Sequence, residues 1–179
     1  MKRIISLLIS LILLMGCVFS LTSCYISTAP KVPDGYKVYE NFGISFAYPD
    51  DWSKEGDIAT MLMNPAGIGN NIVVLFEPKN DIYNNLTLES FNKKIRPSYE
   101  ANGIIPLNVS ISEGTTNNIS YVMICYDTSV SGIDMQQTQI ITTQGIFTHI
   151  VTITEVTDDP ALTETVISTL YARHLLPII

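Results

Sequence analysis

Residues 107–155 read LNVSISEGTTNNISYVMICYDTSVSGIDMQQTQIITTQGIFTHIVTITE, and this stretch decides the fold. It is rich in Ile, Val, Thr and Tyr, which favour strands, and clusters of turn-forming residues interrupt it at Gly114–Asn118, Ser131-Gly132 and Gln144-Gly145. Short spacings between apolar runs are typical of antiparallel hairpins. The sequence therefore predicts a meander of strands at residues 109–113, 120–129, 133–143 and 146–155.

Shorter strands are expected before this stretch. Apolar residues alternate at Ile44, Phe46 and Tyr48, which places them on one face of a strand that Pro49 ends. Ile72–Phe76 is a continuous apolar run, which predicts a strand covered on both faces. The expected strands of this half of the chain are residues 36–39, 44–48, 58–63 and 72–76.

A first helix is expected between the two groups of strands. Thr87 is a suitable N-cap, and residues 88, 91, 95 and 99 form one apolar stripe at helical spacing. Asn102-Gly103 supplies a stop. Pro97 costs about 3 kcal/mol inside a helix, so we expect a kink or an early end near Lys94–Arg96.

A second helix is expected after the last strand. Asp159 can cap it and Pro160 suits its first position, while Arg173 and His174 would close it where cations are favoured. Its apolar stripe is Leu162, Val166 and Leu170, widened by Ile167 and Tyr171. Helices that must cover an antiparallel sheet define the α+β class, and cover on both faces predicts a three-layer α/β/α sandwich.

Composition limits the partners. The chain has 179 residues, which fits one domain, with 10 Lys and Arg against 17 Asp and Glu and a net charge of −7. Nucleic acid is excluded as a partner because a phosphate backbone needs a basic face. Only 2 histidines leave little room for a multi-His metal site, and we expect no metal and no cofactor.

The N-terminus has the pattern of an export signal. Met1–Arg3 is basic, Ile4–Leu21 carries no charge, and Leu21-Thr22-Ser23-Cys24 follows. This ending resembles the signal of bacterial lipoproteins, in which the Cys thiol takes a diacylglyceryl group and becomes the new N-terminus. Residues 1–23 are thus expected to be a lipoprotein signal peptide, and Cys24 the lipidation site.

Two alternatives remain open for this segment. Leu14-Met15-Gly16-Cys17 is a second, poorer match, with the bulky Met15 where small residues are usual. An uncleaved segment of 18 residues is also near the lower limit for a membrane-spanning helix. All three readings place the body on the extracytoplasmic face of a membrane, lipid-anchored in the first two.

Residues 24–35 are expected to be a flexible tether and residues 36–179 the folded domain. Two prolines and a terminal Asp34-Gly35 make the tether a poor helix or strand. Removal of residues 1–23 takes away two basic residues and no acidic one. The remaining chain has 8 Lys and Arg against 17 Asp and Glu, a net charge of −9. Such a body is expected to stand off an anionic membrane surface.

The segment Phe42–Trp52, FGISFAYPDDW, resembles the opening signature of the PsbP-like superfamily, which includes bacterial DcrB-type lipoproteins and a eukaryotic Ran-binding protein. Asn71–Glu77 and Gly145–Ile150 are similar in kind to later strands of that family. The resemblance implies an α/β/α sandwich around an antiparallel sheet and an accessory or partner-binding role. It transfers no metal, cofactor or partner site, and Trp52 is expected to be packed in the core.

No catalytic residue is assigned. His149 is expected to be a packed, hydrogen-bonded histidine, and His174 a solvated one. We expect a turn at Asp50-Asp51 and a helix cap at Asp158-Asp159. We also expect a loop at Gly67–Asn71, and Cys125 is expected to be a buried structural cysteine. The glycosylation triplets begin at Asn85, Asn108 and Asn118.

These observations favour a membrane-anchored extracytoplasmic lipoprotein that acts as a non-catalytic accessory or binding module with an envelope protein or ligand as its partner. The main alternative is a cell-envelope hydrolase whose site is assembled from distant residues. A pocket in which His149 meets a Ser and a carboxylate would favour this alternative, whereas a filled core around His149 would favour the binding module. A secreted eukaryotic glycoprotein is the third reading.

Overall fold

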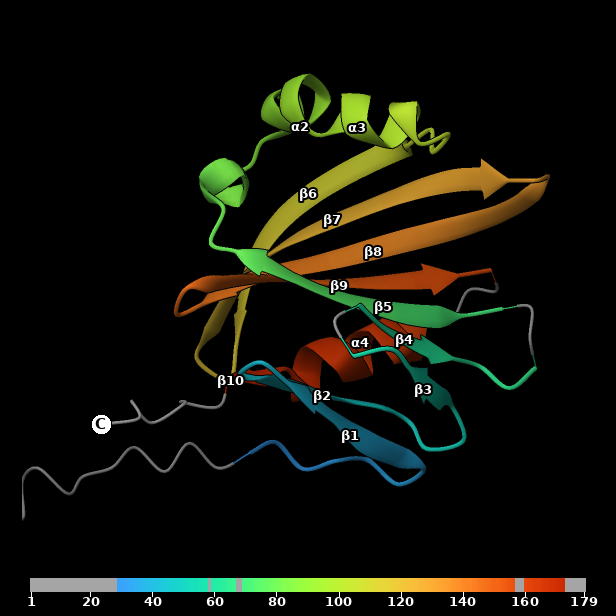
Figure 1. The fold of residues 1–179 in the computed structure, drawn as a ribbon, viewed down its shortest axis with the longest axis vertical. Coiled ribbons are helices and arrows are strands. Elements are labelled where there is room, and N and C mark those ends of the chain that lie inside the picture. The colour runs from blue at the N-terminus through green and yellow to red at the C-terminus, as the bar shows by residue number, and fades with distance from the viewer. Residues whose placement is uncertain (1–28, 58, 67–68, 157–159, 173–179) are drawn as a thin grey trace, which may run out of the picture.

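The computed structural model describes residues 29–57, 59–66, 69–156 and 160–172, and its elements follow one another as strands, a helix pair, four long strands and a last helix (Figure 1). The signal segment with Cys17 and Cys24, Asp158-Asp159, Arg173 and His174 lie outside the described residues. The elements are β1 Tyr36–Asn41, β2 Ile44–Pro49, β3 Ser53–Glu55, β4 Thr60–Met63, β5 Asn71–Pro78, a 3₁₀ turn Asp81–Tyr83, α2 Leu88–Lys94, α3 Arg96–Ala101, β6 Leu107–Thr116, β7 Ile119–Val130, β8 Ile133–Gln144, β9 Phe147–Glu155, α4 Pro160–Thr169 and β10 Tyr171–Ala172.

The larger sheet has seven strands in the order β3-β4-β5-β9-β8-β7-β6, and all its pairs are antiparallel. The predicted meander is confirmed, because β6 to β9 pair in sequence order through short turns. Asn117 and Asn118 have φ of 44° and 63°, and Ser131-Gly132 have 53° and 80°. Two successive left-handed residues match the twist of hairpin strands, which explains why Asn, Ser and Gly occupy these turns. The α+β class is therefore correct.

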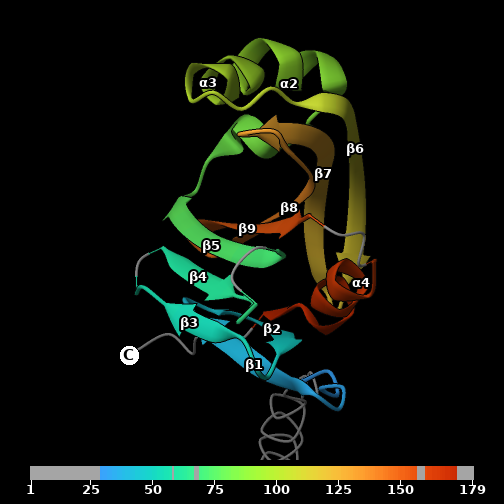
Figure 2. The ribbon, with the colours of Figure 1, turned by 90° about the vertical axis from the view of Figure 1, so that its right-hand side faces the viewer.

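One face of this sheet is covered by α4 and by a second sheet; we call it the α4 face. Ile140, Val151 and Ile153 point into it and are fully buried. They belong to one cluster with the stripe of α4 and with the inward side chains of β1, β2 and β4. Figure 2 shows α4 lying across the curved sheet, with β1 and β2 below it.

The opposite face, the α2–α3 face, is covered by the helix pair at one side only. Phe91 and Ile95 of the helices pack on Ile124 and Tyr126 of β7. The prediction that β5 is covered on both faces is wrong, since Leu75 is 41% exposed while Ile72 and Val74 are buried on the α4 face. The helix pair reaches over β6 to β8 and leaves β5 open (Figures 1 and 2).

The predicted break in the first helix is confirmed. Thr87 caps α2 through a reciprocal capping box with Ser90, and α2 ends at Lys94. Ile95 has φ of −109°, and α3 then starts at Arg96 with Pro97 in its first turn. Proline is tolerated in a first turn, where no intrahelical acceptor is required, so the chain restarts the helix there instead of kinking it.

A second sheet in the order β1-β2-β10 was not expected from the sequence. Tyr171 and Ala172 pair with Ser45 and Ile44 of β2, so the prediction that Tyr171 continues the last helix is wrong. The side-chain amide of Asn117 donates to the carbonyls of Ser168 and Leu170 at 2.9 and 3.0 Å. These bonds satisfy carbonyl groups at the helix end and let the chain leave α4 as a strand.

The Phe42–Trp52 segment forms the turn of the β1–β2 hairpin, strand β2 and the turn after it. Phe42 and Gly43 have φ of 45° and 87°, and this left-handed conformation costs a bulky residue such as Phe42 about 1–2 kcal/mol. Trp52 is 5% exposed and part of the core, as predicted. The Lys37 ammonium donates to the carbonyls of Asp50 and Trp52 and so holds the turn that follows Pro49.

Thr169 joins the last helix to the small sheet. Its buried hydroxyl accepts a hydrogen bond from the backbone N–H of Ala47 at 2.8 Å and donates to the carbonyl of Thr165. We expect Thr169→Val to lower the free energy of unfolding by about 1–3 kcal/mol, because the Ala47 N–H then stays buried without an acceptor. Urea unfolding followed by circular dichroism measures the loss.

Ser168→Ala is the matched control for that substitution. Ser168 also donates to the carbonyl of Thr165, but its side chain is exposed. An equal loss in both variants would contradict the role given to Thr169.

Candidate functional site

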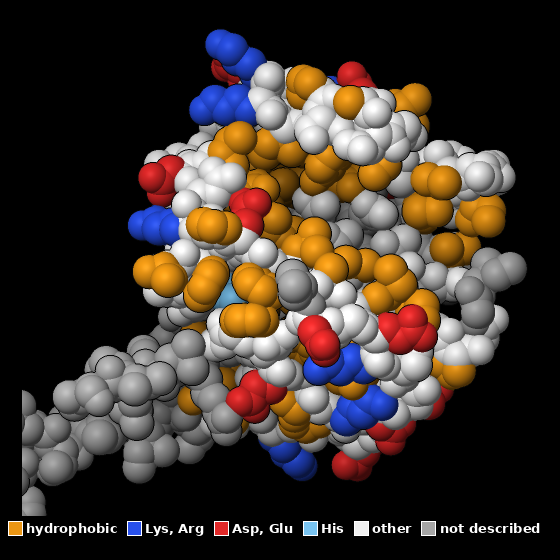
Figure 3. All heavy atoms as spheres, viewed as in Figure 1, with side chains coloured by type: hydrophobic (Ala, Val, Ile, Leu, Met, Phe, Trp, Pro, Cys, Tyr) orange, Lys and Arg blue, Asp and Glu red, His pale blue; other side chains and the backbone are white. Residues whose placement is uncertain are grey.

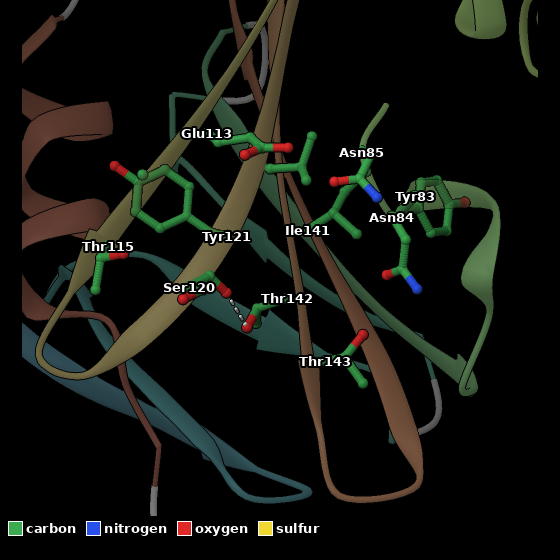
Figure 4. Close-up of a pocket in the computed structure, with 12 residues that line it drawn as sticks. Tyr83, Asn84, Asn85, Glu113, Thr115, Ser120, Tyr121, Ile141, Thr142 and Thr143 are labelled. Atoms are coloured by element: carbon green, nitrogen blue, oxygen red, sulfur yellow. Dashed lines mark hydrogen bonds between the residues drawn. The ribbon is translucent and has the colours of Figure 1, made fainter. Parts of the chain in front are cut away.

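The main cavity lies at one end of β6, β7 and β8 and has a volume of about 580 Å³. The strand register puts Glu113 opposite Val122 and Val122 opposite Ile141, and the next row holds Thr115 and Ser120. Tyr83, Asn84 and Asn85, which follow the 3₁₀ turn, form the facing wall (Figure 4). The remaining residues at its boundary are Gly114, Tyr121, Thr142 and Thr143.

Hydrogen bonds fix the wall relative to the sheet. The backbone N–H of Asn80 donates to the Thr148 hydroxyl of β9 at 3.1 Å, and the Asn80 carboxamide oxygen accepts from the N–H of Ile82. Asn84 bonds back to Asp81 through its side chain and its backbone. The cavity is therefore bounded by anchored segments.

Gly114 and Tyr121 shape the floor. They face each other across β6 and β7, and a Cβ added to Gly114 would lie 2.4 Å from the ring of Tyr121. The ring thus occupies the space that a side chain at position 114 would fill, and in Figure 4 it points away from the wall of Tyr83 and Asn84. A glycine in the middle of a strand here allows this close approach.

The chemistry of the cavity is that of hydroxyl and amide groups. Its single carboxylate is Glu113, and neither Lys, Arg nor His is among the described residues that line it. Burial, together with the Glu77 carboxylate and Tyr99, raises the pKa of Tyr83 to about 12, so this phenol keeps its proton at neutral pH and remains a hydrogen-bond donor. Ser120 accepts a bond from the Thr142 hydroxyl at its backbone carbonyl, at 2.9 Å. Glu113 is the one lining group with the chemistry of a general base, and no His among the described residues lies in the cavity to form a nucleophile–His pair.

His149 is buried on the α4 face and lines none of the three cavities described. It is 1% exposed, with Phe76 and Thr142 as its neighbours across the strands. The prediction of a packed histidine is confirmed, but the expected hydrogen bond is lacking at Nε2, which has no partner. Desolvation by burial lowers the pKa of His149 to about 4, so the ring is neutral at pH 7.

The other residues considered from the sequence lie apart from the cavity, except Asn85. Cys125 is half-buried and its sulfur accepts from the Thr138 hydroxyl at 3.6 Å. Asp50-Asp51 form an exposed turn. Asn118 is an exposed turn residue and Asn108 an exposed residue of β6 where the strand register shifts, and both have positive φ. Among the described residues, no three His, Cys, Asp or Glu side chains are placed to hold a metal ion, and no helix is both long and apolar enough to span a membrane.

A second cavity of about 460 Å³ opens at the other end of the sheet. The strand register aligns Asp127, Gln136 and Glu155 across β7, β8 and β9, and Asp134 lies at its edge. Asn108 donates to the carboxylate of Asp127 at 2.8 Å. Sequence reasoning missed both cavities, because their residues come from segments whose register is set by long-range pairing.

Comparison with known proteins assigns no family. No protein-family model and no curated protein matches the chain. A solved structure from Bacteroides thetaiotaomicron is similar at a TM-score of 0.49 and 21% identity over 74% of this chain, which spans 46% of that protein. A protein of unknown function from Pseudomonas aeruginosa is similar at a TM-score of 0.45 and 15% identity, over 77% of this chain and 97% of that one. Neither likeness carries an argument about function.

The buried neutral His149 makes stability depend on pH. Its folded pKa of about 4 lies below the unfolded value of 6.5, so the unfolded chain binds more protons between these values and stability falls as the pH drops from about 6.5 to 4. We expect this residue to contribute about 3 kcal/mol of that loss. Urea unfolding at several pH values, for the native chain and for His149→Leu, measures it.

His149→Leu removes the titrating group but leaves the carboxylates in place. Its stability should therefore fall less steeply than that of the native chain over the same pH range. Parallel pH profiles for the two proteins would contradict the assignment.

Proposed function

We propose that this protein is a membrane-anchored extracytoplasmic lipoprotein, lipidated at Cys24, whose PsbP-like α/β/α domain acts as a non-catalytic accessory or ligand-binding module. The observation that carries the proposal is the sequence Leu21-Thr22-Ser23-Cys24 at the end of a charge-free apolar segment that follows Lys2 and Arg3. No metal and no cofactor is part of it.

The chemistry of the described residues supports binding over catalysis. The main cavity offers hydroxyl and amide groups with Glu113 as their single carboxylate, and His149 is buried away from it. The alternative of an envelope hydrolase needs a nucleophile, a base and an orienting acid within hydrogen-bond reach. The only described histidine has an unpartnered Nε2 and no carboxylate bonded to it, which weighs against this alternative.

The ligand that fits the main cavity is an uncharged molecule with several hydroxyl or amide groups, such as a sugar. Asn84, Asn85 and Ser120 can each donate and accept hydrogen bonds, and the ring of Tyr83 offers an apolar surface beside them. The lone carboxylate of Glu113 and the negative net charge disfavour anionic ligands.

Acylation is tested by the mass of the protein extracted from bacterial membranes. We expect a diacylglyceryl-modified chain that begins at Cys24, loss of the acyl mass in Cys24→Ala, and its retention in Cys17→Ala. Cys17→Ala is the matched control because it changes the same residue type in the second, poorer motif. Acyl mass that is lost only in Cys17→Ala would assign the lipidation site to Cys17 instead of Cys24. An unmodified cytosolic chain or a glycan at Asn85 would overturn the proposal.

Ligand binding is tested by ligand-detected NMR with N,N′-diacetylchitobiose and, separately, inorganic phosphate. We expect the sugar to bind and phosphate not to, and Ser120→Trp to abolish sugar binding by filling the cavity. Ser112→Trp is the control, since Ser112 is an exposed residue of β6 outside the cavity lining. Preferential binding of phosphate, or equal sugar binding by both variants, would contradict the assignment.

A further inference from the structure

Two hairpin turns at one end of the molecule carry exposed apolar residues. Phe42 of the β1–β2 turn is 41% exposed, and Ile146 of the β8–β9 turn is 74% exposed. Figure 3 shows hydrophobic side chains gathered on that side of the molecule, where Figure 1 places both hairpins. We call Phe42, Phe76, Ile146 and Phe147 the hairpin patch.

Ring contacts hold the patch together across the two sheets. The ring centroids of Phe42 and Phe76 are 3.8 Å apart, and Phe147 lies 5.7 Å from Phe76 and 6.1 Å from Phe42. The three rings therefore form a continuous, preorganised surface built by segments that are distant in the sequence, and Ile146 precedes Phe147 in the chain.

The turns themselves do not explain these residues. Positions with φ of 45° in two-residue hairpin turns favour Asn, Asp or Gly, yet Phe42 occupies one. The turns between the long strands use Asn, Ser or Gly at such positions, for example Asn117-Asn118 and Ser131-Gly132. In the β8–β9 turn Gly145, with φ of 60°, takes the left-handed position, so Phe42 is the hairpin residue that breaks this local rule, and an exposed Phe at such a position marks a functional surface.

The tether starts from this same side. In Figure 1 the described chain before β1 begins below the end of the small sheet that carries the β1–β2 turn and then runs along that sheet to Tyr36. Only five residue steps separate Cys24 from residue 29, and they extend at most about 18 Å. An acyl chain on Cys24 would thus hold the hairpin patch within reach of the bilayer surface.

We propose that the hairpin patch rests on the membrane that holds the anchor, with Ile146 and Phe42 inserted at the interface between headgroups and acyl chains. This inference rests on the proposed lipidation of Cys24. The exposed apolar area is small, so the patch alone binds the membrane weakly. The contact depends on the lipid anchor, which raises the effective concentration of the hairpin patch at the bilayer. Lys79, whose N–H donates to the carbonyl of Ile146 at 2.8 Å, lies beside the patch, where its charge favours anionic headgroups.

This contact fixes the orientation of the domain. The remaining surface has excess negative charge and is repelled by an anionic leaflet, so only the end that carries the patch approaches it. The opposite end of the long strands carries Val130 and Ile133, which are 44% and 41% exposed, and points away from the bilayer. That end supplies a matched control.

The test uses the full-length lipidated protein in vesicles of phosphatidylethanolamine and phosphatidylglycerol with brominated phosphatidylcholine. Tryptophan is introduced as Ile146→Trp or, as the control, Val130→Trp. Ile146 is an exposed turn residue and Val130 is the exposed last residue of β7, and the native Trp52 is a common buried background. We expect the brominated lipid to quench the new tryptophan at position 146 about twofold more than that at position 130. If circular dichroism shows that Ile146→Trp does not fold, Phe42→Trp provides a second reporter.

The outcomes separate the two proposals. Loss of the acyl mass on the purified chain overturns the proposed function. An acylated chain with equal quenching at both positions, or stronger quenching at position 130, overturns the membrane contact alone. Burial of the tryptophan introduced at position 146 in native membranes but not in the lipid vesicles assigns the patch to a protein partner. This outcome also overturns the membrane contact.

Discussion

Burial of one face of the seven-stranded sheet is the constraint on which the structure depends. Ile140, Val151 and Ile153 present a continuous apolar surface that no single neighbouring element can cover. Removing such residues from water is the main driving force for folding, and a β-rich surface of this width needs a second layer. Here the cover comes from both ends of the described chain, as β1 and β2 supply one part and α4 the other.

The same arrangement explains why the cavities lie where they do. The helix pair covers only the β6 to β8 side of the opposite face, so the ends of the long strands and the face of β5 are left open. Hairpin strands with well-formed turns give these open regions a fixed floor, and loop residues such as Tyr83–Asn85 form the walls. Binding residues on loops held by a rigid sheet are a common solution, because loops change composition without loss of the core.

The regions that could be predicted from sequence are those governed by local rules. The strands β6 to β9 follow from alternation and turn residues, and the break at Ile95 follows from Pro97. Sheet membership could not be predicted, because the pairing of Ile44 with Ala172 depends on packing and not on either segment alone. The main cavity was missed for the same reason, since Tyr83 and Ser120 meet only after the register is set. His149 was correctly expected to be packed, but its unpartnered Nε2 leaves no signal in the sequence.

The pairing of β2 with β10 has a consequence for the order in which the protein can mature. Ala47 and Thr169, which hydrogen bond across this region, are 122 residues apart in the chain. A polypeptide that crosses a membrane N-terminus first delivers β1 and β2 long before their partners arrive, and contacts of such high sequence separation form slowly. If the chain is exported as proposed, its first hairpin lacks its cover until residue 172 has crossed, so the emerging chain needs shielding from aggregation during translocation.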